Sequence, residues 1–368
     1  MKKAGIGLII IFAFIFCTKS LAFDKAALEQ VRNKPVLDSS DFEVIDSCLA
    51  VAIQELWLTE DFTEISRLRA QIRTTKESNK DSSREQYHKQ YYSSAHKYIG
   101  QALEQAQMLS DARQQFRITL NLMILIYELG DSQLVDLIVD KLNDKNMAIR
   151  YWAVNIIANQ QVIEQLNTEQ DNYELTVRII QQLGKAIIDS EPGTLSLIAE
   201  FARDIKIPQA GQLLVKIADL RIKQYADWSV KDEVLDAVIL KALSQKMLPN
   251  SPETAVAERF CQLFSFVIQR YYKGADLLTE DTKKQLISVI AETEDKCIKK
   301  LLAPQQKIQN ALEKKDMEQL WKEHNLLLGE EAREGQIPAK FQFIYKRADG
   351  RESSAPQTLP IPPEKPNT

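Results

Sequence analysis

The chain has 368 residues, of which 47 are basic and 51 are acidic, so its formal net charge at pH 7 is −4. This balance argues against a nucleic-acid partner, because nucleic-acid-binding surfaces are strongly basic. Glycine and proline, which punctuate β-proteins, number only 11 and 12, and five of the prolines lie beyond residue 355. Together with the abundance of Leu, Ile, Ala, Gln, Glu and Lys, this composition predicts an all-α fold.

The first 22 residues have the features of a secretory signal peptide. Lys2 and Lys3 form a positive start, residues 4–17 form an apolar run that is short for a membrane span, and Ser20 and Ala22 place small side chains at positions −3 and −1. We expect cleavage after Ala22 and export to the periplasm or the extracellular space. The alternative is an uncleaved N-terminal membrane anchor. No stable membrane span is expected after cleavage, because later apolar runs are short and interrupted by polar residues.

Two amphipathic helices are predicted next, over Asp41–Leu58 and Phe62–Ile72, because their apolar residues recur every three or four positions. They form a helical hairpin within residues 23–73. Residues 74–86 contain no apolar side chain. This polar linker is therefore expected not to pack, and to form a loop or the frayed start of the following helix.

A helix rich in tyrosine is predicted from Tyr87 to Leu109. Its tyrosines are either a recognition surface or part of an amphipathic helix, and we favour the second interpretation, in which the rings rim the core and the hydroxyls face water. The next helix runs to Leu129. Gly130 follows it, where a left-handed cap residue is favourable.

The segment Leu134–Asn159 predicts a pair of amphipathic helices around an Asn143-Asp144 turn. With Arg150 three residues before Ala153 in the second helix, the pattern resembles one HEAT repeat. The resemblance implies that Asp144 and Arg150 tie adjacent repeats together, while Ala153 completes the repeat signature. The expected buried positions are Leu134, Leu137, Ile138 and Leu142 in the first helix, and Ile149, Ala153, Ile156 and Ile157 in the second.

A single pair of this kind cannot bury its apolar side alone. The resemblance therefore implies a HEAT- or armadillo-like helical-hairpin solenoid, a right-handed α-α superhelix. We assign residues 87–330 to it, with a tetratricopeptide array as the alternative. Similar helices recur about every 35–45 residues, as in helical-hairpin repeats. The further helices are predicted over Asp171–Asp189, Thr194–Asp204, Gln209–Tyr225, Val230–Lys246, Pro252–Tyr272, Asp281–Leu302, Gln305–Lys314 and Asp316–Leu328.

The second helix of the recognised pair is the candidate binding surface. In HEAT-type stacking the second helices line the concave side, so the resemblance places Ala148–Asn159 there. Tyr151 and Asn155 lie four residues apart on a face that the apolar stripe leaves free. Tyr151 is the preferred contact with another protein, because tyrosine combines a large contact area with a polar tip. Trp152 is expected in the core.

Motifs for catalysis or metal binding are scarce. The histidines and cysteines show no zinc-ligand spacing, and the sequence contains neither a phosphate loop nor a nucleophile elbow. We therefore expect no enzyme, no metal and no cofactor. Cys261 and Cys297 both lie among apolar residues and are candidates for a disulfide in an exported protein. Two unpaired buried thiols are the favoured alternative.

The C-terminal end changes character. Phe341, Phe343 and Tyr345 alternate with other residues, which predicts a short strand or an extended segment within residues 331–351. Residues 352–368 are rich in proline and serine and are expected to form a disordered tail.

These features predict a non-catalytic exported solenoid that binds another protein, as a scaffold or adaptor in the cell envelope. The alternative is an enzyme on a HEAT-like scaffold, of the alkylpurine DNA glycosylase or the phycobilin lyase type. A glycosylase needs a basic groove and access to DNA, and the acidic balance and the export signal argue against both. A lyase needs a pigment, of which the sequence gives no sign.

Overall fold

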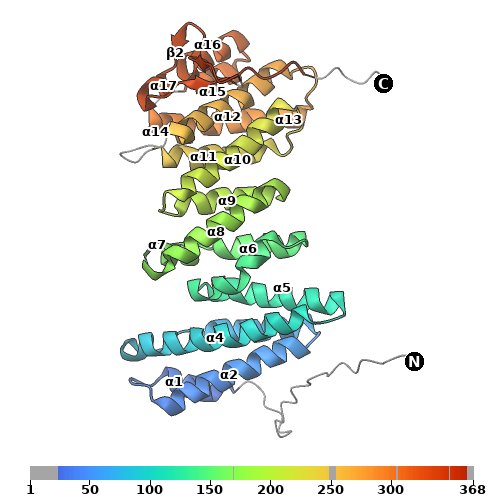
Figure 1. Ribbon diagram of the computed structural model, residues 1–368, viewed down its shortest axis with the longest axis vertical. Helices are drawn as coiled ribbons and strands as arrows, with labels where there is room; N and C mark the ends of the chain where they lie inside the picture. Colours follow the sequence, from blue (N-terminus) through green and yellow to red (C-terminus); the bar gives the residue numbers. More distant parts are fainter. Residues whose placement is uncertain (1–23, 169, 248–253, 304–305, 348, 363–368) are drawn as a thin grey trace, which may run out of the picture. The chain divides into compact units, whose positions relative to one another are not determined.

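The computed structural model describes residues 24–168, 170–247, 254–303, 306–347 and 349–362 (Figure 1). The predicted signal peptide lies outside these residues. Helices form nearly all of the regular structure described, with strands of only two residues beside them, which confirms the all-α prediction. Within the described residues no helix is both long and apolar enough to cross a membrane. The chain divides into two compact units, Met1–Leu129 and Gly130–Thr368.

The first unit is built from helices that pack through short loops. Helix α2 lies against α4, and α3 contacts both α2 and α5. The predicted hairpin is the α2–α3 pair, and its apolar stripe, including Ile45, Leu49, Ile65 and Leu68, is buried as expected. Helix α1 was not predicted. The elements are α1 Lys25–Arg32, α2 Ser39–Leu58, α3 Phe62–Thr74, η1 Asp81–Ser83, α4 Arg84–Gln107 and α5 Ala112–Leu129.

The polar segment 74–86 packs, contrary to the prediction. Ser78 and Ser83 are buried. The Ser78 hydroxyl donates a hydrogen bond to the Arg32 carbonyl (3.1 Å), and the Ser83 hydroxyl donates to the Lys34 carbonyl (2.7 Å). The prediction was wrong because short hydroxyl side chains can be buried without apolar contacts when they satisfy carbonyl groups left free at the end of a helix.

Three of the four tyrosines of α4 belong to the core, and the interpretation that placed their hydroxyls in water was wrong for them, whereas Tyr98 is half-buried. Tyr87, Tyr91 and Tyr92 are at most 3% exposed. The Tyr91 hydroxyl donates to the Ile72 carbonyl in the last turn of α3 (2.6 Å), and the Tyr87 hydroxyl donates to the carbonyl of Thr75 (2.8 Å). These bonds satisfy carbonyl groups that the end of a helix leaves without an intrahelical partner.

The second unit begins at Gly130, whose φ of +64° is the left-handed conformation expected after the preceding helix. The predicted helices are present, and α7 and α17 are unpredicted additions. Helix α17 lies within residues 331–351, so the extended segment predicted there was wrong for Gln336–Phe341. The helical elements are η2 Ser132–Asn143, α6 Met147–Ile157, α7 Gln160–Thr168, η3 Gln170–Asn172, α8 Tyr173–Ala186, η4 Ile187–Asp189, α9 Pro192–Asp204, α10 Gln209–Ala226, η5 Glu233–Leu235, α11 Asp236–Lys246, α12 Thr254–Lys273, α13 Glu280–Thr293, η6 Glu294–Ile298, α14 Lys299–Leu301, α15 Lys307–Glu313, α16 Met317–Leu328 and α17 Gln336–Phe341.

Most of these elements stack in two rows within the unit. In one row η2 contacts α8, α8 contacts α10, and α10 contacts α12. In the other row α6 contacts α9, α9 contacts α11, and α11 contacts α13. Figure 1 shows these layers following one another through the unit in the order of the sequence. Within this unit, each pair thus packs against the pair that follows it in the sequence.

The first helix of the HEAT-like pair differs in type from the prediction. Residues Ser132–Asn143 form a 3-10 helix, η2, which is unusually long for this tight geometry. Leu137, expected in the core, is half-buried, whereas Val135 is buried. Leu134, Ile138 and Leu142 are buried as expected, so the buried face keeps three of the four predicted residues and gains Val135 and Val139.

The C-terminal region contains two short antiparallel strand pairs, β1 Gly329–Glu330 with β2 Arg333–Glu334 and β3 Tyr345–Lys346 with β4 Glu352–Ser353. The alternating aromatic residues are divided between two elements, since Phe341 ends α17 and Tyr345 lies in β3. The prediction of a disordered tail is wrong for residues 352–362. They are ordered because side chains of α12 bind their backbone.

Candidate functional site

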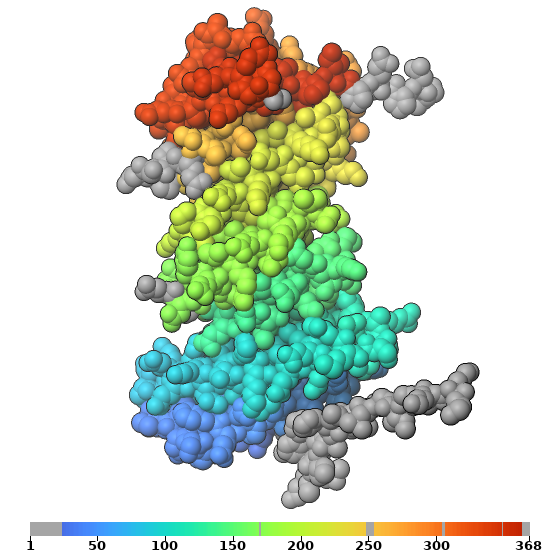
Figure 2. Space-filling view, in the orientation of Figure 1, coloured from blue at the N-terminus to red at the C-terminus, as the bar shows by residue number. Residues whose placement is uncertain are grey.

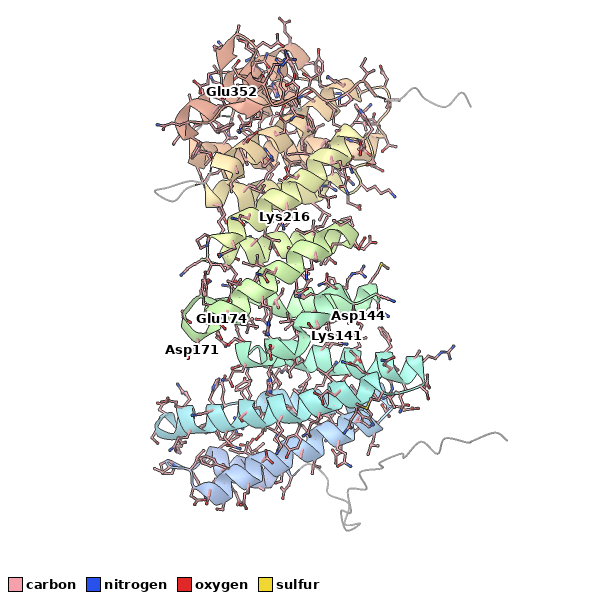
Figure 3. The ribbon with its side chains drawn as sticks, in the orientation of Figure 1. Lys141, Asp144, Asp171, Glu174, Lys216 and Glu352 are labelled. Atoms are coloured by element: carbon pink, nitrogen blue, oxygen red, sulfur yellow. The ribbon has the colours of Figure 1, made fainter. Side chains whose placement is uncertain are left out.

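Helix α6, the second helix of the HEAT-like pair, begins at a well-capped turn. Asn146 is its N-cap, and the Asn146 side chain accepts hydrogen bonds from the backbone N–H groups of Ala148 (2.9 Å) and Ile149 (3.4 Å). Asp144 accepts from the Asn146 N–H at 2.9 Å, and its carboxylate lies 3.9 Å from the Lys141 ammonium. Figure 3 labels Asp144 and Lys141 at this end of the pair. Asp144 thus orders the turn, and Asn146 caps the helix.

Arg150 links this turn to the next layer. Its guanidinium donates to the Asp144 carbonyl at 2.7 Å and to the Lys145 carbonyl at 3.3 Å. It also donates to the carbonyl of Asp189, the last residue of η4, at 3.1 Å. The contact between Arg150 and Asp144 therefore runs through the aspartate backbone. A planar guanidinium suits this role, because its donors point in several fixed directions at once.

The two faces of α6 differ sharply. Ala153 is fully buried, as are Ile156 and Ile157. On the other side Met147 and Tyr151, one turn apart, are 57% and 42% exposed. Asn155 is half-buried, and so is Trp152, which was expected in the core. The Trp152 ring stands edge-on to the Tyr151 ring at 6.2 Å between centroids. This face carries a short apolar and aromatic row with a polar residue at its end.

Cys261 and Cys297 do not form the disulfide considered from the sequence. Both are buried free thiols. Cys261 interacts with the Tyr345 hydroxyl, and Cys297 interacts with Ser244. Burial raises the pKa of each thiol, which keeps it protonated and unreactive. The two cysteines lie on different helices but face different partners, so no bridge forms.

A buried Ser–His contact is the arrangement most like a catalytic pair. The Ser265 hydroxyl lies 2.8 Å from His324 Nε2, and His324 Nδ1 lies 2.9 Å from the Asn325 amide oxygen. Because that oxygen can only accept, Nδ1 donates to it and Nε2 accepts from Ser265. However, Ser265 is fully buried and His324 is 2% exposed. A substrate would have no path to this pair, which instead supports its neighbour Gln269, whose amide donates to Ser265 at 2.8 Å.

The remaining features to consider are clusters of metal-binding side chains and surface depressions. The described residues contain no group of three or more His, Cys, Asp or Glu side chains placed to hold a metal ion. An open depression of about 760 Å³ is lined by Thr168, Asp171, Tyr173 and Glu174, among others. Figure 3 shows Asp171 and Glu174 on the side of the unit opposite Asp144.

The polar residues of α12 that hold the C-terminal tail were not predicted from the sequence. Gln262 and Gln269 are 5% and 2% exposed although glutamine is mostly found at protein surfaces. The available signal was their position among the apolar residues of a predicted helix. That position predicts a buried polar residue with a specific partner, but it does not say that the partner is a segment some 90 residues away.

Comparisons with known proteins do not assign this chain to a family. No protein-family model matches the chain, and no curated protein matches it. Among solved structures, an engineered protein is similar over 82% of this chain and 95% of its own, with 13% sequence identity and a TM-score of 0.20. A similarity this weak bears on neither the fold nor the function.

Proposed function

We propose that this protein is an exported, non-catalytic solenoid of the HEAT type that binds another protein, as a scaffold or adaptor in the cell envelope. The observation that carries the proposal is the exposed pair Met147 and Tyr151 on one face of α6. Large exposed apolar and aromatic side chains on a rigid element are typical of protein-binding surfaces. Arg150 supplies the rigidity by tying the start of α6 to η4.

The two rows of stacked helices support the HEAT-type part of the proposal. A right-handed superhelix of such pairs has an extended concave side, which serves as a docking surface in this architecture. The resemblance to HEAT repeats assigns that side to the second helices, and hence to the row that begins with α6. Export is proposed from the signal-peptide features of residues 1–22, and the net charge of −4 favours a protein over a nucleic-acid partner.

The binding surface is tested by a capture experiment with a matched control. The mature chain serves as bait in an envelope extract of the native host, beside Tyr151→Ala and Tyr173→Ala variants. Tyr173 is a similarly exposed tyrosine on α8, at 50%. We expect Tyr151→Ala to weaken partner binding by at least about 1 kcal/mol while barely changing the melting temperature, and Tyr173→Ala to bind normally. If both variants capture the partner as well as the parent does, the α6 face is not the binding surface.

Export is tested separately. The intact mass of the protein purified from the native host should correspond to a chain that starts at Phe23. A chain that still starts at Met1 and sediments with membranes would instead establish the N-terminal anchor.

A further inference from the structure

The C-terminal tail lies extended along α12, the helix of the second unit that is richest in buried polar residues. In Figures 1 and 2 the tail is the dark-red segment that runs over the surface of this unit. On α12, Gln262 and Gln269 are two turns apart and Lys273 follows one turn later, so all three side chains lie along one face of the helix.

These three side chains contact the tail through hydrogen bonds to its backbone. Gln262 accepts from the Gln357 N–H at 2.8 Å and donates to the Gln357 carbonyl at 3.3 Å. Gln269 donates to the same carbonyl at 3.0 Å and accepts from the Leu359 N–H at 2.6 Å. Lys273 donates to the Leu359 carbonyl at 2.6 Å. Two alternate residues of the tail are thus held through both of their backbone groups, as a sheet edge holds an added strand.

The side chains of the tail are selected at two positions. Pro356 is buried and Leu359 is 1% exposed, whereas the intervening Gln357 and Thr358 are exposed. A repeat of three is the period of the polyproline II helix. The Trp228 indole N–H donates to the Pro360 carbonyl at 3.2 Å and marks the far end of the contact. The buried side chains of this contact are therefore a proline and a leucine three residues later, and between them the exposed Gln357 amide donates to the Lys346 carbonyl at 3.2 Å.

Buried residues below the tail hold the Gln269 side chain in its binding orientation. Gln269 donates to the Ser265 hydroxyl at 2.8 Å, and Ser265 in turn donates to His324. This buried chain of hydrogen bonds fixes which way the Gln269 amide points, without any help from the tail. Removing the tail would leave the amide groups of Gln262 and Gln269 without the backbone partners they now have, which favours rebinding of a peptide with the same backbone geometry.

We propose that α12 forms a binding groove for extended Pro-x-x-Leu segments of partner proteins, and that residues 354–360 occupy this groove in cis as an intramolecular competitor. The inference rests on the proposed function, because it too assumes that the protein binds other proteins, but it concerns a different surface from α6. A tethered segment acts at an effective concentration in the millimolar range. A partner segment therefore binds appreciably only when it binds more tightly than the tail or when the tail has been released.

The proposal is tested with a chain that ends at Ala355 and a fluorescent peptide of residues 354–362 as the probe. The truncated chain should bind the peptide, and the full chain should bind it at least about tenfold more weakly because its own tail competes. A peptide with alanine for Leu359 should lose binding, while alanine for the exposed Thr358 should have little effect. A peptide that keeps only Pro356, Leu359 and Pro360 in an alanine background should still bind, which tests the ligand class.

Equal binding by the full and truncated chains, or equal losses from alanine at Thr358 and at Leu359, would overturn the proposal. If the truncated chain does not fold, a full chain with Pro356→Ala and Leu359→Ala provides the test, since its weakened tail should raise peptide binding above that of the parent. A concentration-dependent dimer that disappears on truncation would instead assign the groove to the tail of a second copy. Tyr151→Ala should not alter peptide binding, so failure of the α6 surface and failure of this groove are distinguishable.

Discussion

Arg150 shows how one side chain can join two layers of the helical stack. Three backbone carbonyls, those of Asp144, Lys145 and Asp189, accept hydrogen bonds from its guanidinium. The carbonyls belong to the turn before α6 and to η4, so the side chain spans a boundary between consecutive helical pairs. Its role is therefore expected to concern stability and not partner contact.

Replacing Arg150 with alanine should lower the free energy of unfolding by about 1–3 kcal/mol, because three carbonyls lose a charged donor. Arg150→Lys should recover only part of the loss, since an ammonium cannot reach carbonyls in two directions at once. Chemical denaturation of both variants measures the effect. Unchanged stability with lost partner binding would show that Arg150 belongs to the binding surface instead.

His324 makes the stability of the second unit depend on pH. Burial lowers the pKa of its imidazole from 6.5 to about 4. Between these values the unfolded chain binds a proton and the folded protein does not, so protonation favours unfolding. We therefore expect this group to leave stability unchanged above pH 6.5 and to lower it by about 3 kcal/mol in total as the pH drops to 4.

The pH prediction is checked by urea denaturation from pH 7 to pH 4 of the parent and of His324→Gln. The variant is expected to be less stable at pH 7, because it disturbs the hydrogen bond to Ser265. Between pH 7 and pH 4, its stability should nevertheless fall by about 3 kcal/mol less than the stability of the parent does. Parallel curves would mean that His324 titrates normally in the folded protein.

At the scale of the element, most helices could be predicted because their determinants are local. The range predicted for α10, Gln209–Tyr225, agrees with Gln209–Ala226 in the structure, and that for α12, Pro252–Tyr272, agrees with Thr254–Lys273. Apolar spacing and proline or glycine breaks are contained within each segment itself. The winding of η2 was not predictable in this way, because its residues have no local preference for three over 3.6 residues per turn.

The start of α6 provides a test of such a local determinant. Asn146→Ala should destabilise the second unit by about 1 kcal/mol, because two backbone N–H groups lose the side-chain oxygen that they now share. Lys145→Ala, at the exposed position just before it, should change stability by less than about 0.5 kcal/mol. Thermal melting of the two variants compares them. Equal effects would show that the cap contributes nothing specific.

At the scale of the whole molecule, the cysteines are part of the core and not cross-links. Cys48, Cys261 and Cys297 are buried free thiols, and burial raises the pKa of Cys48 to about 11. Mature protein purified without reductant should therefore show three free thiols after denaturation and very slow labelling before it. Reductant should leave the melting temperature unchanged. One free thiol, or a melting temperature lowered by reductant, would mean that a disulfide forms after all.

The residues proposed to bind partners could be predicted only in part. Tyr151 was selected because helical spacing turns it away from the stripe that contains Ala153, and the two residues do differ in burial in this way. Gln262 and Gln269 were not selected, because their importance depends on residues 357–359, which are distant in the sequence. Helical periodicity describes the faces of one segment, but it cannot say which other segment will cover a face.

The sequence by itself determined the helical class, the position of most helices and the division of α6 into a buried and an exposed face, because spacing and caps act over a few residues. The tertiary structure alone decided where isolated polar groups find partners: the serines of segment 74–86, the tyrosine hydroxyls of α4 and the glutamines that hold the tail. A buried polar group must be hydrogen-bonded, but many donors and acceptors could serve. Which of them does so is settled only when segments far apart in the chain are packed together.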